Sequence, residues 1–274
     1  VHLLAHSWEL MIEELQTEQY DYIIDLHHNT RTLRVKKALK VKSFSFYKLN
    51  IQKYFLTAFK INFLPKVHIV DRYLKTVETL GVKNDGAGLD YFISPDEETK
   101  RHDIPASHAA GYIACVIGAA LGTKKWPVHK WKAFCEQMNH PIILLGGPED
   151  AVAGNEIAST DTVKIYNACG KFKLNERADL IRKAKFVISN DTALMPIAAA
   201  FKKQIISLWG NTVPAFGMTP YYGDAPVAEV VLETKRLWCR PCSKIGFKKC
   251  PLGHFKCMEK IEVEDLFRKA KQRV

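Results

Sequence analysis

The chain has 274 residues, of which 47% are hydrophobic and 25% charged, and this composition is that of a globular protein long enough for two α/β domains. No apolar run reaches the roughly 18–20 residues that a membrane-spanning helix needs. The sequence shows no signal peptide, and we therefore expect a cytoplasmic protein.

The formal net charge is +11, and it is unevenly distributed. Residues 31–65 contain no Asp or Glu, and aromatic residues are interleaved with Lys and Arg there. The stretch from Lys235 onwards is also basic. A solvated protein face, an anionic membrane surface, an acidic glycolipid or a nucleic acid each suits such charge. Nucleic acid is disfavoured because no helix-turn-helix, zinc-finger or RNA-binding signature occurs.

Short elements are predicted in the first third of the chain. Residues 20–26 are apolar and predict a buried strand, and residues 43–47 predict a second one. Residues 68–81 have helical spacing and end on a glycine. The chain begins with Val1, not Met, in a strand-like run, so we expect further chain before it.

The domain boundaries are predicted from a change in composition. Residues 94–107 are polar and contain two prolines, which is typical of a linker. We therefore expect a first domain over residues 1–93, incomplete at its start, and a linker over residues 94–110. A second domain is expected over residues 111–260, followed by a C-terminal helix within residues 261–274.

From residue 111 onwards, strands alternate with short helices, which is the pattern of a parallel, doubly wound α/β sheet. Ligands of such sheets bind outside the carboxyl ends of the strands. The predicted strands are residues 111–118, 141–147, 163–168, 186–190 and 204–210, and the predicted helices are residues 129–138, 149–159, 174–184 and 193–201.

Small or polar turns follow four of these strands and should meet at one edge of the sheet. Helix N-termini at that edge offer free N–H groups and the positive end of a dipole, which suits a phosphate group. Asp191 is also explained by helix N-capping without any ligand. The turns are Gly118–Ala120, Gly146–Gly147, Asn190–Thr192 and Gly210–Thr212.

The segment SNDTALMPIAAAF, followed by QIISLWGNT, resembles the signature of glycosyltransferase family 9, the ADP-heptose:lipopolysaccharide heptosyltransferases. GAALGTKKWPVHKW and LLGGPED resemble the donor-side loops of that family, and YDYIIDLHHNTRT resembles a strand and turn of its N-terminal domain. The resemblance covers nearly the whole chain. It implies the GT-B fold, in which two Rossmann-like domains face a cleft. The C-terminal domain would hold the nucleotide-sugar, and the C-terminal helix would pack back towards the first domain.

An inverting sugar transfer needs positive charge for the departing diphosphate, and Lys124 is the candidate for this role. Lys125 is expected to face water. Asp191, whose charge repels phosphate, is assigned to N-capping or to a sugar hydroxyl, while Thr123 and Thr192 are candidates for donating to phosphate oxygens. The predicted donor-binding set is Ala119, Ala120, Thr123, Lys124, Glu149, Asp191, Thr192, Ala193 and Thr212, with Glu149 assigned to the ribose or adenine, or only to a helix dipole.

The acceptor side is predicted from the polar run after the first strand, which consists of Asp25, His27, His28 and Asn29. The transfer also needs a general base for the acceptor hydroxyl. The resemblance places that base in a Gly-Asp loop at the start of the first domain, and nothing in this chain matches the loop. We therefore expect the base to lie outside these residues, with Asp25 as the first suspect within them.

Two positions depart from the family pattern. The family has Gly after the Asp-Thr pair and His three residues later, whereas this chain has Ala193 and Pro196. Ala193 narrows the approach of the backbone to a diphosphate. Pro196 is expected to distort the following helix if that helix starts at Thr192. Both departures put the identity of the donor in question.

Four of the seven cysteines, Cys239, Cys242, Cys250 and Cys257, lie close together in the chain. A C-x2-C pair followed by two more cysteines suggests a structural zinc site, although the spacing matches no standard finger. Reduced thiols and disulfides are the alternatives, and a cytoplasmic location disfavours disulfides. No cofactor is required for the chemistry itself.

The sequence thus predicts a glycosyltransferase that moves a heptose or a related sugar from an ADP-sugar to the lipopolysaccharide inner core. An anionic, membrane-bound acceptor would explain the basic residues 31–66 and would place the protein at the inner face of the inner membrane. The alternatives are a protein of the same fold that uses another nucleotide-sugar, such as an epimerase, and a degenerate family member without turnover.

Overall fold

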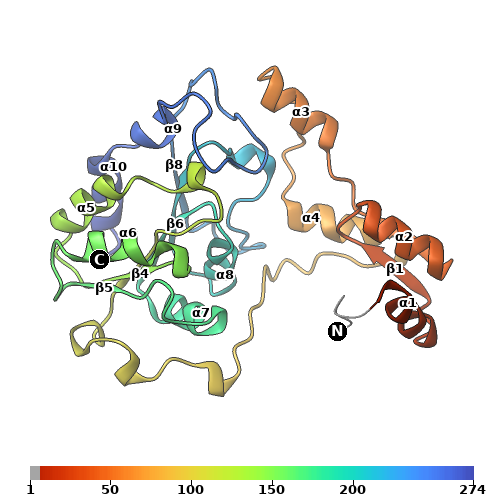
Figure 1. Ribbon diagram of the computed structural model, residues 1–274, viewed down its shortest axis with the longest axis horizontal. Coiled ribbons are helices and arrows are strands. Elements are labelled where there is room, and N and C mark those ends of the chain that lie inside the picture. Colours follow the sequence, from red (N-terminus) through yellow and green to blue (C-terminus); the bar gives the residue numbers. More distant parts are fainter. Residues whose placement is uncertain (1–6) are drawn as a thin grey trace. The chain divides into compact units, whose positions relative to one another are not determined.

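The computed structural model describes residues 7–274, which form two compact units (Figure 1). Unit 1 combines the chain up to Ile51 with Pro65–Asp85, and unit 2 combines Gln52–Leu64 with Gly86–Val274. The second unit therefore begins earlier than the predicted boundary at residue 93, and it also takes in a segment of the first third of the chain. In the described part of the chain, no helix has the length and apolarity needed to cross a membrane.

Unit 1 contains a pair of parallel strands with helices beside it. β1 (Tyr22–Asp25) pairs with β2 (Lys42–Ser45), and α2 (Thr30–Leu39) connects the two. Helix α1 (Trp8–Thr17) packs against α2. Both predicted strands are therefore present, and they are parallel because a helix connects them.

The helix predicted over residues 68–81 is also present, in two pieces. α4 (Ile69–Leu74) continues as a 3-10 helix (Lys75–Leu80) and ends at Gly81, which has the left-handed conformation that favours glycine. The helix α3 (Asn50–Ala58) was not predicted. Its sequence, NIQKYFLTA, does have apolar residues at helical spacing (Ile51, Tyr54, Phe55 and Ala58), and this signal was missed.

The prediction that the first strand is buried is wrong. Tyr22 is 48% and Ile24 40% exposed, whereas Asp25 at the end of β1 is 4% exposed. The cause is the size of the sheet. In the described part of unit 1 it has two strands, and too little apolar surface surrounds them to cover both faces.

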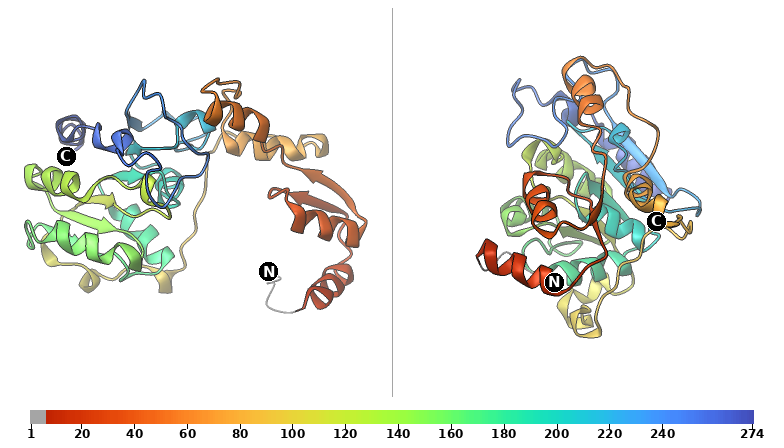
Figure 2. Two further views of the ribbon diagram at one scale, coloured as in Figure 1. Left: turned by 45° about the horizontal axis from the view of Figure 1, so that its top comes forward. Right: turned by 90° about the vertical axis from the view of Figure 1, so that its right-hand side faces the viewer.

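Unit 2 is built on a six-stranded, all-parallel sheet with helices on both faces (Figure 1 and Figure 2), as predicted. The strand order β5-β4-β3-β6-β7-β8 means that the winding direction reverses between β3 and β6. The edge strand β8 was not predicted. The strands are β3 (Ile113–Val116), β4 (Ile142–Leu145), β5 (Ile165–Asn167), β6 (Phe186–Asn190), β7 (Ile205–Trp209) and β8 (Glu229–Glu233), and the helices are α5 (Val128–Gln137), α6 (Ala151–Ala158), α7 (Leu174–Lys183), α8 (Leu194–Ala200), α9 (Lys256–Glu259) and α10 (Val263–Lys271).

Alternate residues of the central strands enter two cores on opposite faces of this sheet. Ile113 and Cys115 of β3 belong to one core, and Ala114 and Val116 belong to the other. Because both faces are covered, each strand needs apolar residues at every position. This requirement is why the strands of unit 2 could be predicted from short apolar runs.

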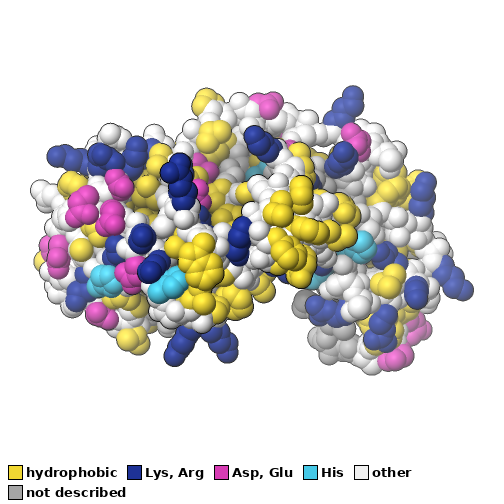
Figure 3. All heavy atoms as spheres, turned by 90° about the horizontal axis from the view of Figure 1, so that it is seen from above, with side chains coloured by type: hydrophobic (Ala, Val, Ile, Leu, Met, Phe, Trp, Pro, Cys, Tyr) yellow, Lys and Arg dark blue, Asp and Glu magenta, His cyan; other side chains and the backbone are white. Residues whose placement is uncertain are grey.

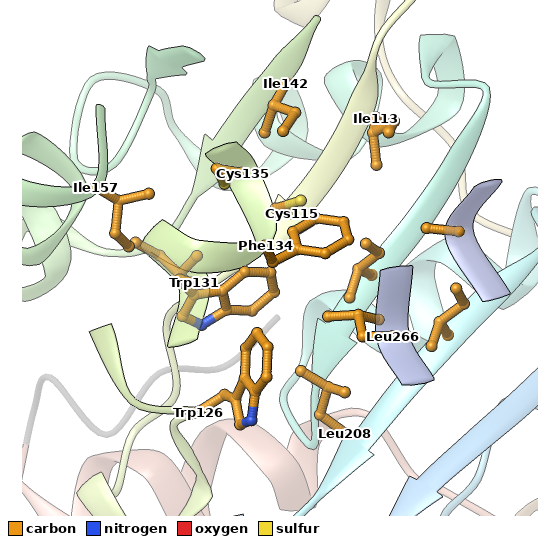
Figure 4. Close-up of a cluster of buried hydrophobic side chains, with 14 of the residues drawn as sticks. Ile113, Cys115, Trp126, Trp131, Phe134, Cys135, Ile142, Ile157, Leu208 and Leu266 are labelled. Carbon is orange, nitrogen blue, oxygen red and sulfur yellow. The ribbon is translucent and has the colours of Figure 1, made fainter. Parts of the chain in front are cut away.

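The C-terminal helix completes one of these cores (Figure 4). Trp126 and Trp131 meet edge to face there, with ring centroids 5.1 Å apart, and Leu266 of α10 lies in the same cluster. That this helix also packs back towards the first domain stays a prediction. Its apolar face, which includes Val263 and Ala270, packs against α5 and β7 of its own unit.

The segment predicted as a linker is folded onto unit 2. Three 3-10 turns, Pro95–Glu97, Arg101–Asp103 and Ala106–His108, occupy it. The backbone N–H and the hydroxyl of Thr99 donate to one carboxylate oxygen of Asp179, at 2.8 and 2.6 Å. Polar composition predicted an exposed chain here, and most of the segment is exposed, but Thr99 is buried and pairs with the buried Asp179.

Candidate functional site

The candidate site lies at the carboxyl ends of β3, β6 and β7, next to the point where the winding of the sheet reverses. Open α/β sheets bind ligands at this location. Three loops leave the strands here, and they contain three of the predicted donor-binding residues, Lys124, Asp191 and Thr212. Lys124 lies in a 3-10 turn (Gly122–Lys124), and the other two directly follow β6 and β7.

These three side chains contact one another and form the central cluster of the site. The Nζ of Lys124 lies 2.8 Å from Oδ2 of Asp191, and the hydroxyl of Thr212 donates to the same oxygen at 2.7 Å. The side chains of Lys124 and Asp191 are 19% and 11% exposed. The two bonds hold the ammonium group of Lys124 in a defined position at the edge of the sheet.

Asp191 does not cap a helix, so that part of its predicted role is wrong. Helix α8 begins at Leu194, its N-cap position is Ala193, and no side chain caps it. Asp191 lies too early in the turn and bonds to Lys124 and Thr212 instead. The alternative assignment of Asp191, to a sugar hydroxyl, stays a prediction.

The late start of α8 also corrects the expectation for Pro196. Because the helix begins at Leu194, Pro196 is its third residue and lies in the first turn, where no N–H has an intrahelical partner. The proline therefore causes no break in the helix. Both Ala193 and Pro196 are exposed, and Thr192 is half-buried.

Lys125 is 31% exposed, so it faces water in part, but it is not simply a solvated side chain as predicted. Its ammonium group forms an ion pair with Asp150, which is 3% exposed, and the second carboxylate oxygen of Asp150 accepts from Gly147 N at 2.9 Å. This pair joins the loop after β3 to the loop after β4. Lys125 is thus a structural residue, whereas its neighbour Lys124 contacts the cluster at the centre of the site.

Two buried asparagines at this edge were missed as individual site residues. Asn190 joins the ends of β3 and β6, since its amide donates to Ile117 O at 2.8 Å and accepts from Trp126 N at 3.2 Å. Asn211 is 1% exposed, and neither its amide nitrogen nor its amide oxygen has a hydrogen-bond partner among the described residues. An unpaired buried amide costs about 1–3 kcal/mol, so this side chain is suited to a polar ligand.

The remaining predicted donor-side residues lie around the same edge. Ala119 is buried and Ala120 exposed, in the loop between β3 and the turn that contains Lys124. Glu149 is exposed, in a 3-10 turn after β4. Thr123 is 2% exposed, and its hydroxyl bonds to the backbone of Phe247. Thr123 is therefore not free to donate to a phosphate oxygen, which corrects its predicted role.

In unit 1 the predicted acceptor residues are mostly engaged in local bonds. Asn29 caps α2, and Nδ1 of His28 lies 2.9 Å from Phe46 O. Asp25 accepts from His27 N and His28 N and forms an ion pair with Lys36 at 2.8 Å. His27 is exposed. Of these four residues, His27 is the one that is exposed and whose ring makes no hydrogen bond to the described residues.

The charge environment of Asp25 makes it a poor base. Burial by itself would raise the pKa of Asp25, but the hydrogen bond from Lys36 and the N–H of His28 more than offset burial and lower the pKa to about 2. A general base works best when its pKa lies near the operating pH. Asp25 therefore does not fit the role of a base at neutral pH.

Unit 1 has a separate hollow of about 370 Å³ that the sequence analysis missed. It lies near the carboxyl end of β2, and Arg72 and Lys75 supply positive charge without any acidic neighbour in its lining. Arg72 lies 4.9 Å from the centre of the Phe46 ring and donates to Tyr47 O at 3.0 Å. Residues 68–81 were predicted only as a helix. The lining consists of Ser45, Tyr47, Leu49, Pro65, Val67, Arg72, Lys75 and Thr76.

A structural zinc at the four cysteines stays a prediction. All seven cysteines are free, and no three His, Cys, Asp or Glu side chains within residues 7–274 are placed to hold a metal ion. Cys239 Sγ lies 3.8 Å from His254 Nε2. Burial, with the neighbouring thiols, raises the pKa of Cys257 to about 11, so its thiol stays protonated at neutral pH. A metal ion deprotonates the thiols that it binds, so this pKa of the free thiol does not decide whether the cysteines hold zinc.

A parallel sheet with polar turns at its carboxyl edge defines unit 2 as an α/β domain of the nucleotide-binding type. The family model of glycosyltransferase family 9 (heptosyltransferase) matches residues 8–250, and the chain belongs to this family.

Two curated relatives of this chain are heptosyltransferases, in agreement with the family match. The lipooligosaccharide heptosyltransferase 2 of Haemophilus influenzae is 27% identical over 208 residues, which are 73% of this chain and 57% of that protein. The lipopolysaccharide heptosyltransferase 2 of Salmonella typhimurium is 31% identical over 122 residues, 42% of this chain and 35% of that protein. The chain thus spans about half the length, or less, of these curated relatives.

Solved structures confirm the fold class, α/β of the GT-B type. A family 9 glycosyltransferase from Veillonella parvula superposes with a TM-score of 0.72 at 21% identity, covering 96% of this chain and 76% of that one. The ADP-heptose lipopolysaccharide heptosyltransferase II of Escherichia coli gives 0.65 at 18% identity, covering 96% and 79%. An E. coli heptosyltransferase solved with ADP gives 0.64 at 19% identity, covering 97% and 77%.

Proposed function

We propose that this chain transfers a heptose, or a closely related sugar, from an ADP-sugar to the lipopolysaccharide inner core with inversion. The observation that carries the proposal is the cluster of Lys124, Asp191 and Thr212 beside the unpaired amide of Asn211. A fixed ammonium group, polar turns and a buried amide at the carboxyl edge of a parallel sheet suit a nucleoside diphosphate.

The chemistry requires charge stabilisation at the leaving group. The acceptor oxygen bonds to the anomeric carbon from the face opposite the diphosphate. The bond from that carbon to the diphosphate oxygen then breaks with its electron pair, and the hydroxyl proton passes to a base. In this scheme Lys124 stabilises the negative charge that develops on the departing ADP. Asp191 keeps the ammonium group in place through its bond of 2.8 Å.

For the acceptor we propose the hollow in unit 1. Arg72 is held by the Phe46 ring and by Tyr47 O, and its remaining N–H groups suit a carboxylate or a phosphate. Lys75 lines the same hollow. Anionic sugars of a lipopolysaccharide inner core have this chemistry, so Arg72→Gln should raise the acceptor KM while leaving the ADP affinity unchanged.

Membrane attachment is a further part of the proposal. Four aromatic residues of unit 2, Tyr54, Phe55, Phe59 and Phe63, form an aromatic cluster in which Phe55 contacts the other three rings. Tyr54, Phe59 and Phe63 are each 57–62% exposed, and Figure 3 shows hydrophobic side chains gathered on the face where α3 lies. The cluster lies in the acid-free residues 31–65. Exposed aromatics in a basic segment suit the interface of an anionic bilayer.

Vesicle sedimentation tests this attachment. Phe59→Ser with Phe63→Ser should reduce binding to phosphatidylglycerol vesicles, whereas Val152→Ser, at a more exposed apolar residue outside the cluster, should not. Neutral phosphatidylcholine vesicles should bind the wild type more weakly, and added salt should weaken binding to the anionic ones. Equal binding to both lipids would contradict the role of charge, and unchanged binding of the double variant would contradict the aromatic cluster.

The alternatives concern the donor and turnover. Ala193 lies in the turn that leads into α8, where a Cβ limits the approach of a diphosphate, and this favours another donor or a protein without turnover. Calorimetry with ADP and UDP separates these cases. Binding of ADP in preference to UDP supports the proposal. The reverse preference supports another donor, and ADP binding without transfer to any core acceptor supports a degenerate member.

A further inference from the structure

The segment from Cys239 to Cys257, here called the four-cysteine loop, contacts both loops that form the candidate phosphate site. Its thiols do not form a metal site in the described structure. Two places in the loop make the contacts, the Arg240 side chain and the backbone of Phe247. Each of the two contacts holds a different loop of the site.

Arg240 holds the loop after β7. Its side chain is 6% exposed and pairs with Glu233 at 2.7 Å. The guanidinium donates to Trp209 O at 3.3 Å, to Gly210 O at 2.5 Å and to Thr212 O at 2.8 Å. These three carbonyls surround Asn211 in the chain. A planar guanidinium can bond several carbonyls at once because its five donors are rigidly arranged.

Phe247 holds the loop after β3. Its N–H donates to the hydroxyl of Thr123 at 2.8 Å, and its carbonyl accepts from Thr123 N at 3.1 Å. The two backbone segments approach closely here, since a Cβ on Gly122 would lie 2.3 Å from Lys248 O. Thr123 immediately precedes Lys124. The position of the Lys124 ammonium group therefore depends on this backbone pairing.

The two held loops also contact each other. A Cβ on Gly210 would lie 2.6 Å from Thr123 O, so the loop after β7 passes directly against the loop after β3. The buried thiols of Cys239 and Cys257 and the fully buried Met258 fasten the four-cysteine loop to the rest of unit 2. A displacement of this loop would move both phosphate-site loops together.

We propose that the four-cysteine loop is a positioning element for the donor site, with Arg240 and the backbone of Phe247 as its positioning residues. The identity of the ligand in this proposal rests on the proposed function. The claim that the loop positions Lys124 and Asn211 rests on the contacts alone. The loop sets the distance between Lys124 and Asn211, the two groups that would contact a diphosphate from different strands. Its sequence need not include any residue that touches the ligand.

Matched substitutions in the full chain test this role. Arg240→Gln removes the guanidinium, and Lys244→Gln removes the same charge from an exposed position of the same loop. Thr123→Val removes the hydroxyl that bonds Phe247, and Thr123→Ser retains it. Arg240→Gln and Thr123→Val should weaken ADP binding about tenfold or more, as expected for the loss of one or two hydrogen bonds that orient the site. Lys244→Gln and Thr123→Ser should bind ADP like the wild type.

Hydrogen exchange of the free protein provides the second measurement. Arg240→Gln and Thr123→Val should speed exchange at the amides of residues 122–124 and 210–212, while strands of the sheet stay protected. A merely structural role would instead lower the unfolding temperature and leave the ADP affinity of the folded protein unchanged. That result, or wild-type exchange in both variants, would overturn the proposal. If the wild type binds no ADP, the proposed function fails, and the exchange data alone decide the positioning role.

Discussion

Replacing Lys124 and Lys125 one at a time separates a role at the diphosphate from a role in stability. Lys124→Ala removes the ammonium group and leaves Asp191, of which 11% is exposed, bonded only to Thr212. Loss of a group that stabilises the leaving charge costs about 2–4 kcal/mol in the transition state, or roughly 30- to 1000-fold in kcat/KM. The free energy of unfolding should fall by less than for Lys125→Ala, because the Asp191 side chain is 11% exposed, against 3% for Asp150, and keeps its bond from Thr212.

In Lys124→Ala the carboxylate of Asp191 has lost its counter-charge and should repel a diphosphate, and a double variant tests this second effect. A charge of Asp191 about 5 Å from a phosphate oxygen, at an effective dielectric constant of about 20, would repel it by about 3 kcal/mol. Adding Asp191→Asn to Lys124→Ala removes this repulsion. The double variant should therefore bind ADP more tightly than Lys124→Ala alone, although transfer should not return to the wild-type rate.

Lys125→Ala should behave differently. It breaks the pair with Asp150, which is 3% exposed, and leaves that carboxylate bonded only to Gly147 N. We expect a loss of about 2–3 kcal/mol in the free energy of unfolding, at the lower end for a buried pair because Lys125 is partly exposed. Urea unfolding measures the free energy of unfolding, calorimetry measures the ADP affinity, and a transfer assay with ADP-heptose measures kcat/KM. Equal losses of transfer at the two positions, without a difference in stability, would refute the assignment of Lys124.

Three further predictions follow from single residues. Burial raises the pKa of Glu229 to about 7, although the hydrogen bond from Ser207 opposes it. The folded state therefore binds the proton more tightly than the unfolded state, and the free energy of unfolding falls as pH rises from about 4.5 through 7. In urea unfolding at pH 5 and 8, Glu229→Gln should remove about 1–3 kcal/mol of this fall. An unchanged pH dependence would contradict the role of Glu229. Asn211→Ala should weaken ADP binding about tenfold without lowering the unfolding temperature, because the buried amide of Asn211 is unpaired. A lower unfolding temperature with unchanged ADP affinity would count against a ligand at Asn211. The pKa of Asp25 is lowered to about 2, mainly by Lys36 against the opposing effect of burial, so the stability from this pair is present above pH 4 and is lost as pH falls through 2. Asp25→Asn should cost about 1–2 kcal/mol at pH 7 and less at pH 2.5, and an equal loss at both pH values would refute the ionic origin.

Much of unit 2 could be predicted from local sequence. The five predicted strands match because a parallel sheet covered on both faces requires apolar residues at every position. The edge strand β8 (Glu229–Glu233) escaped prediction because a glutamate stands at each end and its residues are only partly buried. In unit 1 the same apolar pattern was misleading, since Tyr22 and Ile24 are exposed on a two-stranded sheet.

The site was predicted in its location but not in its bonds. Polar turns after apolar strands indicated the edge where Lys124, Asp191 and Thr212 meet, because the carboxyl ends of parallel strands lie together. The partners of individual side chains depend on contacts between distant residues. Lys125 bonds to Asp150, 25 residues away, and Thr123 bonds to the backbone of Phe247, 124 residues away. Neither pairing leaves a local sequence signal.

The sequence by itself determined the family, the parallel sheet of unit 2 and the edge at which a ligand would bind, because short-range hydrophobic patterns and turn residues specify them. Only the tertiary structure decided which of two adjacent lysines bonds to Asp191, that the predicted linker and the C-terminal helix belong to unit 2, and that the four-cysteine loop contacts the loops after β3 and β7. These outcomes depend on strand order and on the close packing of loops, which bring together groups that no spacing along the chain relates.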